Sequence, residues 1–216
     1  MTNTNKIIYL SISLIILLGI GYLLINKAPT DDVVLPPNSL AIAIKTFTAS
    51  DGTFTFNYNQ LFKVVTNNKP SLDWELNATQ QGVLLATLSI SKSDKYMPQT
   101  NFSDSKLTIG RSTDTSAIKN CLVDNSGMNV KGVDAIVGGY PFKKFIFSGV
   151  GAGNLYETTS YKGILDGDCY VVESTIHSTN IGNYPPESGI KEFDKTKAAN
   201  DLALVVQSMR FMLASD

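Results

Sequence analysis

The sequence is poor in the side chains that most often perform catalysis or bind metals. Only one of its 216 residues is a histidine, and two are cysteines. A catalytic triad or a cysteine–histidine pair would therefore have to use His177. A structural zinc site takes four ligands, more than two cysteines and one histidine supply. We therefore expect no metal site, no cofactor and no catalytic residue.

Charge is also scarce, and it is nearly balanced. Charged residues make up 17% of the chain, and the formal net charge is −1. No stretch gathers lysine or arginine into a basic patch, so nucleic acid is not an expected partner. The motif G-x-S-x-G is absent, and the two S-x-x-K matches, Ser89–Lys92 and Ser116–Lys119, lack the companion motifs of serine acyl-enzymes. The sequence thus favours a non-enzymatic module over an enzyme.

A run of glycines, Gly149–Gly153, resembles a phosphate-binding loop only superficially. It matches neither G-x-G-x-x-G nor a P-loop, and it precedes a predicted strand rather than a helix. We interpret it as a flexible connector between two strands. The alternative is a ligand loop formed by Gly151, Gly153 and Asn154 with the nearby Tyr156 and Tyr161.

What the sequence does contain is one long apolar stretch, Ile7–Ile25, which carries no charge. Nineteen helical residues rise about 28 Å, close to the thickness of a bilayer's hydrocarbon core. A buried core helix would show a polar face, and a cleaved signal peptide would need a better cleavage site than Asn26–Ala28. We predict an uncleaved anchor with its short N-terminal tail in the cytoplasm.

This anchor sets the predicted domain plan and location. Pro36-Pro37 interrupts any helix and favours an extended linker. We expect the protein at the cell membrane as a single-pass protein with its C-terminal domain outside the cytoplasm. The predicted parts are a cytoplasmic tail (1–6), a transmembrane anchor (7–25), a linker (26–39) and an extracytoplasmic domain (40–216).

Both cysteines, Cys121 and Cys169, fall in the part predicted to be exported. An even number of cysteines in an oxidising compartment indicates a disulfide. The alternative is two separate buried thiols.

The pattern of the exported part predicts an α+β fold. Phe54, Phe56 and Tyr58 alternate with polar residues, which is typical of a half-buried strand. Residues 129–176 read as an antiparallel meander with turns at Gly138-Gly139 and Asp166-Gly167. In the strand 140–147 the alternation breaks at Lys143-Lys144, where we expect a bulge.

Helical patterns flank these strands. Residues 114–122 predict a short helix capped by Asp114 or Thr115, and residues 195–209 predict an amphipathic helix capped by Asp194. Phe193 is placed to pack back onto that second helix as a hydrophobic staple. We therefore expect an antiparallel sheet flanked by helices.

Asp51–Tyr58 followed by Phe62–Val64 resembles the opening of PsbP/Mog1-like domains, in which an aromatic strand leads into a turn. The helix 195–209 and the strand residue Phe211 resemble the end of such domains. Segments between them, including Thr100–Asp104, are similar to uncharacterised membrane-anchored proteins of candidate-phyla bacteria. The resemblance implies an antiparallel sheet flanked by helices and a protein-binding or assembly role, and it supplies no active-site residues.

The sequence therefore predicts a bacterial membrane-anchored envelope module that binds a protein or a ligand without catalysis. Two alternatives remain open. One is an envelope hydrolase that uses His177, which requires a Ser or Asp within hydrogen-bond reach of the ring. The other is a structural subunit of an envelope assembly, which predicts a large exposed apolar patch.

Overall fold

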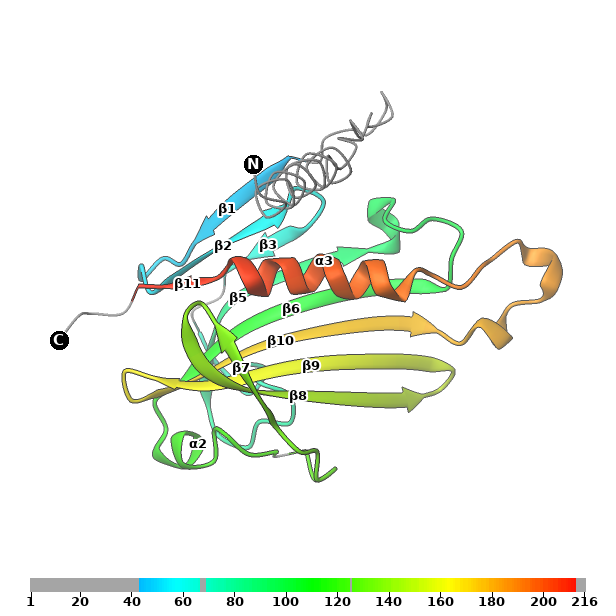
Figure 1. Cartoon of the computed structure of the whole chain (residues 1–216). Helices are drawn as coiled ribbons and strands as arrows, with labels where there is room; N and C mark the ends of the chain where they lie inside the picture. The colour runs from blue at the N-terminus through cyan, green and yellow to red at the C-terminus, as the bar shows by residue number, and fades with distance from the viewer. Residues whose placement is uncertain (1–42, 67–68, 125, 213–216) are drawn as a thin grey trace, which may run out of the picture. The chain divides into compact units, whose positions relative to one another are not determined.

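The computed structural model describes residues 43–66, 69–124 and 126–212 (Figure 1). The predicted anchor, Ile7–Ile25, and the linker, 26–39, lie outside the described residues. Within the described ranges no helix has the length and apolar character needed to cross a bilayer. The elements are β1 (Ile44–Thr48), β2 (Phe54–Asn59), β3 (Lys63–Val65), β4 (Pro70–Ser71), β5 (Gly82–Ser91), η1 (Lys92–Asp94), β6 (Phe102–Ser112), α2 (Thr115–Lys119), β7 (Val133–Val137), β8 (Tyr140–Gly151), β9 (Asn154–Leu165), β10 (Asp168–Thr179), η2 (Ile181–Asn183), η3 (Pro186–Ser188), α3 (Lys195–Ser208) and β11 (Arg210–Phe211).

The strands are antiparallel, as the alternating sequence pattern predicts, but they form two sheets rather than one. The larger has eight strands in the order β3-β5-β6-β10-β9-β8-β7, with β4 beside β5, and the smaller has the order β1-β2-β11. Long neighbouring strands such as β9 and β10 pair along their whole length. The hairpin turn between these two strands is Asp166-Gly167, where both residues have positive φ (49° and 81°), as the Asp-Gly pair predicts.

Each face of the large sheet carries its own apolar core. Successive side chains of a strand point to opposite faces. On β10, Tyr170 and Val172 therefore join one core, while Cys169 and Val171 join the other. This two-sided burial explains why β10 has almost no polar face in its first half.

The first core lies between the large sheet, the small sheet and helix α3. Helix α3 contacts β2 of the small sheet and β10 of the large sheet (Figure 1). Phe54 and Phe56 are fully buried here, as their spacing predicts. The Asp194 carboxylate caps α3 by accepting from the Lys197 N–H at 2.8 Å, and Phe193 packs against Phe102 with ring centroids 5.8 Å apart.

The second core lies on the opposite face, beneath Trp74 and the short helix α2. Asp114 caps α2 as predicted, accepting from the Ser116 and Ala117 N–H groups. The predicted disulfide between Cys121 and Cys169 is confirmed, with Cα atoms 5.7 Å apart.

The bulge expected at Lys143-Lys144 is not found. Lys143 pairs with Lys162 and Lys144 with Tyr161 in an unbroken register. The alternation breaks because the buried face changes along β8: Phe142 belongs to the first core, whereas Phe145 lies over the opposite face, beside the Lys162 ammonium. Register shifts occur instead at Leu84/Ala86 and His177/Ser178.

The glycine run is not a floppy connector either. β8 continues to Gly151 and pairs in register with β9, so that Gly149 lies opposite Tyr156 and Gly151 opposite Asn154. Only Ala152 and Gly153 form the turn, with φ of 48° and 78°. The long neighbouring strand β9 holds these glycines extended, which their own composition does not indicate.

Candidate functional site

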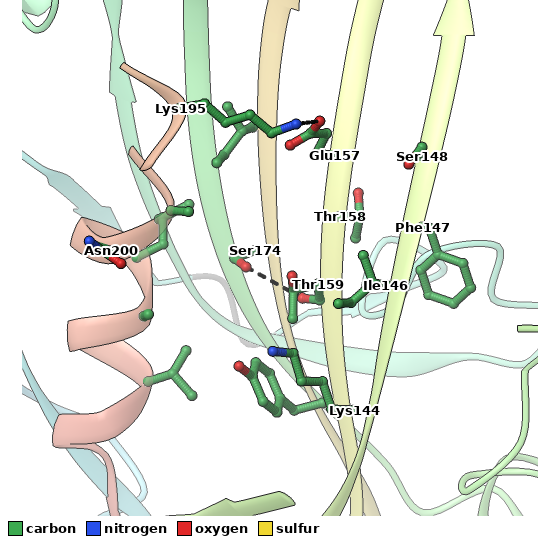
Figure 2. Close-up of a pocket in the computed structure, with 16 residues that line it drawn as sticks. Lys144, Ile146, Phe147, Ser148, Glu157, Thr158, Thr159, Ser174, Lys195 and Asn200 are labelled. Atoms are coloured by element: carbon green, nitrogen blue, oxygen red, sulfur yellow. Dashed lines mark hydrogen bonds and ion pairs between the residues drawn. The ribbon is translucent and has the colours of Figure 1, made fainter. Parts of the chain in front are cut away.

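A groove of about 450 Å³ lies between α3 and the strands β8, β9 and β10 (Figure 2). Helix α3 buries one side, with Ala198 and Leu202 in the first core. Its flank toward β8 and β9 carries Ala199 and Ala203, whose small side chains leave room beside the sheet. We call this cavity the α3 groove.

The floor of the α3 groove is set by strand alternation. On β9 every second residue faces it, namely Glu157, Thr159 and Tyr161. Their partners on β8, in the same order, are Ser148, Ile146 and Lys144. Because paired residues of neighbouring strands project to the same face, these six side chains form one continuous floor.

Two lysines give the groove its charge. Lys195, at the start of α3, pairs with Glu157 across the cavity, as the dashed line in Figure 2 shows. Lys144 lies over the Tyr161 ring, with the ammonium 5.7 Å from the ring centroid, and no described carboxylate forms an ion pair with it. Burial raises the pKa of the Tyr161 phenol, so this group stays protonated and can donate a hydrogen bond.

The α3 groove combines polar groups with apolar surface. Its polar groups are hydroxyls, the Asn200 amide, the Lys195–Glu157 ion pair and the Lys144 ammonium, and they lie beside an apolar strip that includes Ile146, which is 59% exposed. Ser174 donates to the Thr159 carbonyl at 3.4 Å. No histidine or cysteine is among the described residues that line the groove, and its carboxylate, Glu157, is ion-paired with Lys195.

His177 lies on the other face of the sheet, away from the α3 groove. Its Nδ1 is 2.8 Å from Asp104 Oδ2 and its Nε2 is 2.9 Å from Asn154 Oδ1. The ring also stacks on Tyr156, with centroids 4.5 Å apart. Asp104 is 73 residues away from His177 along the chain, so local sequence patterns do not reveal these contacts.

The five residues of the predicted ligand loop do not form one site. Asn154 and Tyr156 surround His177, next to the turn that contains Gly153. Tyr161 lies in the α3 groove on the opposite face, because it is an odd number of positions along the strand from Tyr156. Gly151 ends β8.

A buried ionic cluster on the second face was not predicted. Lys162 Nζ donates to Glu75 Oε2 at 2.8 Å, and both side chains are 3% exposed. Glu173 accepts from the Leu76 N–H through Oε2 at 2.6 Å. Burial raises the pKa of Glu173 despite the nearby Lys162 ammonium.

Gly110 of β6 allows this cluster to form. A Cβ at position 110 would overlap the Trp74 carbonyl oxygen. The absence of a side chain therefore lets the segment around Trp74 lie directly on the sheet, which brings Glu75 over Lys162. The need for a glycine at position 110 is visible only in the folded structure, where Trp74 lies against it.

Comparisons with known proteins concern the fold alone. No protein-family model matches the chain, and no curated protein matches it. Among solved structures it is similar to one from Bacteroides thetaiotaomicron VPI-5482, with 10% identity over 80% of this chain and 50% of that one, at a TM-score of 0.40. This chain thus spans half the length of that structure.

Two further structures are similar at 8% identity. Cyanobacterial PsbP (CyanoP) from Synechocystis sp. PCC 6803 matches over 83% of this chain and 99% of that one, at a TM-score of 0.38. LpqN of Mycobacterium tuberculosis, described as involved in cell envelope biogenesis, matches over 79% and 91%, at 0.34. A PsbP protein is thus among the structures that this fold resembles, as the sequence predicts; likenesses this distant carry no argument about function.

Proposed function

We propose that this protein is a non-enzymatic binding module of the cell envelope that holds a segment of a partner protein in the α3 groove. The observation that carries the proposal is the groove itself. It joins an apolar strip at Ile146 to a rim of hydroxyls and a lysine, Lys144, without a described carboxylate partner. Apolar surface supplies affinity, while a few polar groups orient the bound segment.

We also propose that the module is held at the cell membrane. The module is tethered by Ile7–Ile25 and stands outside the cytoplasm at the end of the linker 26–39. The disulfide Cys121–Cys169 supports this, because such bonds persist in oxidising compartments and are rare in the cytosol.

A hydrolase that uses His177 has one observation in its favour, the hydrogen bond between His177 and Asp104. Two observations weigh against it. The second ring nitrogen already bonds to Asn154, and among the described residues no serine or cysteine hydrogen-bonds to the ring. A triad needs that nitrogen to accept the proton of a nucleophile. The binding module therefore accounts for the geometry better.

Site-specific photo-crosslinking tests the binding proposal. A photoreactive phenylalanine at Ala199, inside the groove, should label a distinct protein in the native membrane. The same probe at Leu204, which is exposed on another side of α3, should not. The variant Ala203→Trp fills the groove and should reduce labelling at position 199 at least five-fold while the protein still melts cooperatively. Equal labelling at both positions, or labelling unaffected by the tryptophan, would contradict the proposal.

A further inference from the structure

Strand β8 extends beyond its outer neighbour. β7 pairs only with the first part of β8, from Tyr140 to Lys144. The rest, 145–151, pairs with β9 on one side and with no described residue on the other. Figure 1 shows this part of β8 along the border of the large sheet. The edge is seven residues long, which is enough for another strand to pair with it.

The hairpin turns at the two ends of β8 determine which backbone groups of this edge have no hydrogen-bond partner. Gly151 and Asn154 flank a two-residue turn, so they form a hydrogen-bonded pair, and such pairs alternate along an antiparallel ladder. The N–H and C=O groups of Phe145 and Phe147 therefore point toward β9. Those of Ile146, Ser148 and Val150 point outward. The Gly138-Gly139 hairpin gives the same result, because Tyr140 forms a hydrogen-bonded pair with Val137 of β7 and every second residue of β8 after Tyr140 points to that side.

This edge carries none of the usual protection against pairing. Natural edge strands are shielded by charged residues, proline or bulges. The segment 145–152 contains no charged residue and no proline, and its register with β9 is unbroken. Ile146 is 59% exposed and Val150 is 81% exposed. Water therefore covers both an unpaired backbone edge and apolar side chains.

We propose that the edge of β8 pairs with the same edge of a second copy of this chain, antiparallel and about a two-fold axis at Ser148. In that register Ile146 lies opposite Val150 of the partner subunit, so each exposed apolar side chain meets another. Such a self-complementary contact is the isologous kind that closes a dimer. The two large sheets become one continuous sheet.

Charge favours a second copy over an unrelated strand. Lys144, the nearest charge along β8, already pairs on this side with Val133 of β7, so it lies outside the seven-residue edge and the pairing brings no like charges together. The exposed Leu155 of β9 pairs with Val150 within each copy, and it extends the apolar row across the interface. The inference stands independently of what the α3 groove binds.

Cysteine cross-linking tests the predicted axis. The native cysteines are bonded to each other, so Ser148→Cys adds the only free thiol to the full-length protein. A hydrogen-bonded pair has Cα atoms about 5.5 Å apart, within the range of a disulfide. In native membranes this variant should form a reducible dimer. The control Ile136→Cys, on exposed β7, should not. Equal cross-linking at both positions, or none at 148, would overturn the proposal.

Sedimentation of the detergent-solubilised full chain gives an independent test. The wild-type protein should be a dimer, and Val150→Lys should be a monomer because it places an ammonium opposite Ile146 of the partner subunit. The control Ile136→Lys adds the same charge at another exposed strand position and should stay dimeric. A monomeric wild type, a dimeric Val150→Lys or an assembly larger than a dimer would refute the two-fold edge contact. Groove labelling at Ala199 that persists in a monomeric protein would leave the proposed function standing.

Discussion

Lys162 places a positive charge in the interior of the second face, where Glu75 is its one ion-pair partner among the described residues. Charges are rarely this buried, because each loses its hydration on folding. When both partners are present the cost is largely offset, whereas removing one partner leaves an uncompensated buried charge. The pair thus makes the stability of this face depend on two residues from distant parts of the chain.

We predict that Lys162→Met destabilises the protein by about 3–5 kcal/mol, because it leaves the Glu75 carboxylate buried without a cation. Urea unfolding followed by Trp74 fluorescence would measure the change. The double variant Lys162→Met with Glu75→Gln removes both charges and should recover most of the loss. A double variant no more stable than Lys162→Met would show that the ion pair is not the source of the effect.

Glu173 should give the folded protein a distinct pH dependence. Burial raises its pKa in the folded state, so its stabilising contribution is complete below the unfolded pKa of about 4.3 and is lost as pH rises through the folded value. Glu173→Gln keeps a neutral side chain and an acceptor for the Leu76 N–H. We expect the variant to match wild type near pH 4 and to be more stable at pH 7. The same stability difference between Glu173→Gln and wild type at both pH values would contradict a raised pKa of Glu173.

Residue-scale features of this kind were beyond the sequence. Glu75 and Lys162 are 87 positions apart, and local patterning says nothing about contacts at that distance. Lys162 alternates with Tyr161 and Gly163 like an ordinary solvent-facing strand residue. It is buried only because the segment around Trp74 covers this face, which in turn depends on Gly110.

At the scale of elements, the disulfide joins the turn just after α2 to β10. Helix α2 has five residues, too few to be stable alone, and Ala117 is its only buried residue. The covalent link to Cys169 compensates for this small contact. It also closes a loop across the strands from α2 to β10.

Replacing both Cys121 and Cys169 by alanine should lower the free energy of unfolding by about 4 kcal/mol on the chain-entropy model, given the 48-residue separation. Denaturant titration of the oxidised protein and the double variant measures this difference. Wild-type protein unfolded in reductant provides a second estimate and should agree with the variant. A loss below about 1 kcal/mol would mean that the reduced chain retains the loop by other contacts.

The elements themselves were largely predictable where turn chemistry and alternation agree. Asp166-Gly167 and Gly138-Gly139 each occupy hairpin turns with positive φ, because Asp and Gly adopt that conformation at low cost. The prediction was wrong where tertiary context decides. At Lys143-Lys144 burial changes sides without a bulge, and Gly149 and Gly151 are held extended by β9.

At the scale of the whole molecule, the α3 groove and the β8 edge adjoin each other. Ile146 and Ser148 line the groove and also carry outward-facing backbone groups of the edge. Edge pairing as proposed would therefore set two grooves on one continuous sheet. A module with paired sites binds a repetitive or dimeric partner with enhanced avidity when the geometry lets both sites engage.

The proposed location predicts that the domain is open to protease from outside the cell. Protease added to intact cells, with any outer membrane permeabilised, should digest the domain 40–216 while a cytoplasmic marker stays intact. Thiol labelling without reductant should find Cys121 and Cys169 blocked. Protection of the domain, or free thiols in the exported protein, would contradict the proposed topology.

A second test of this topology changes the charges that flank the predicted anchor. Lys6 precedes the predicted anchor and Lys27 follows it, so lysine and arginine bias the orientation only weakly, and acidic residues contribute little. Changing Asp31 and Asp32 to lysine adds positive charge on the exported side. It should leave a substantial fraction of the chains inverted and protease-protected, whereas changing both to asparagine should not. Unaltered digestion of the lysine variant would show that flanking charge does not set the orientation.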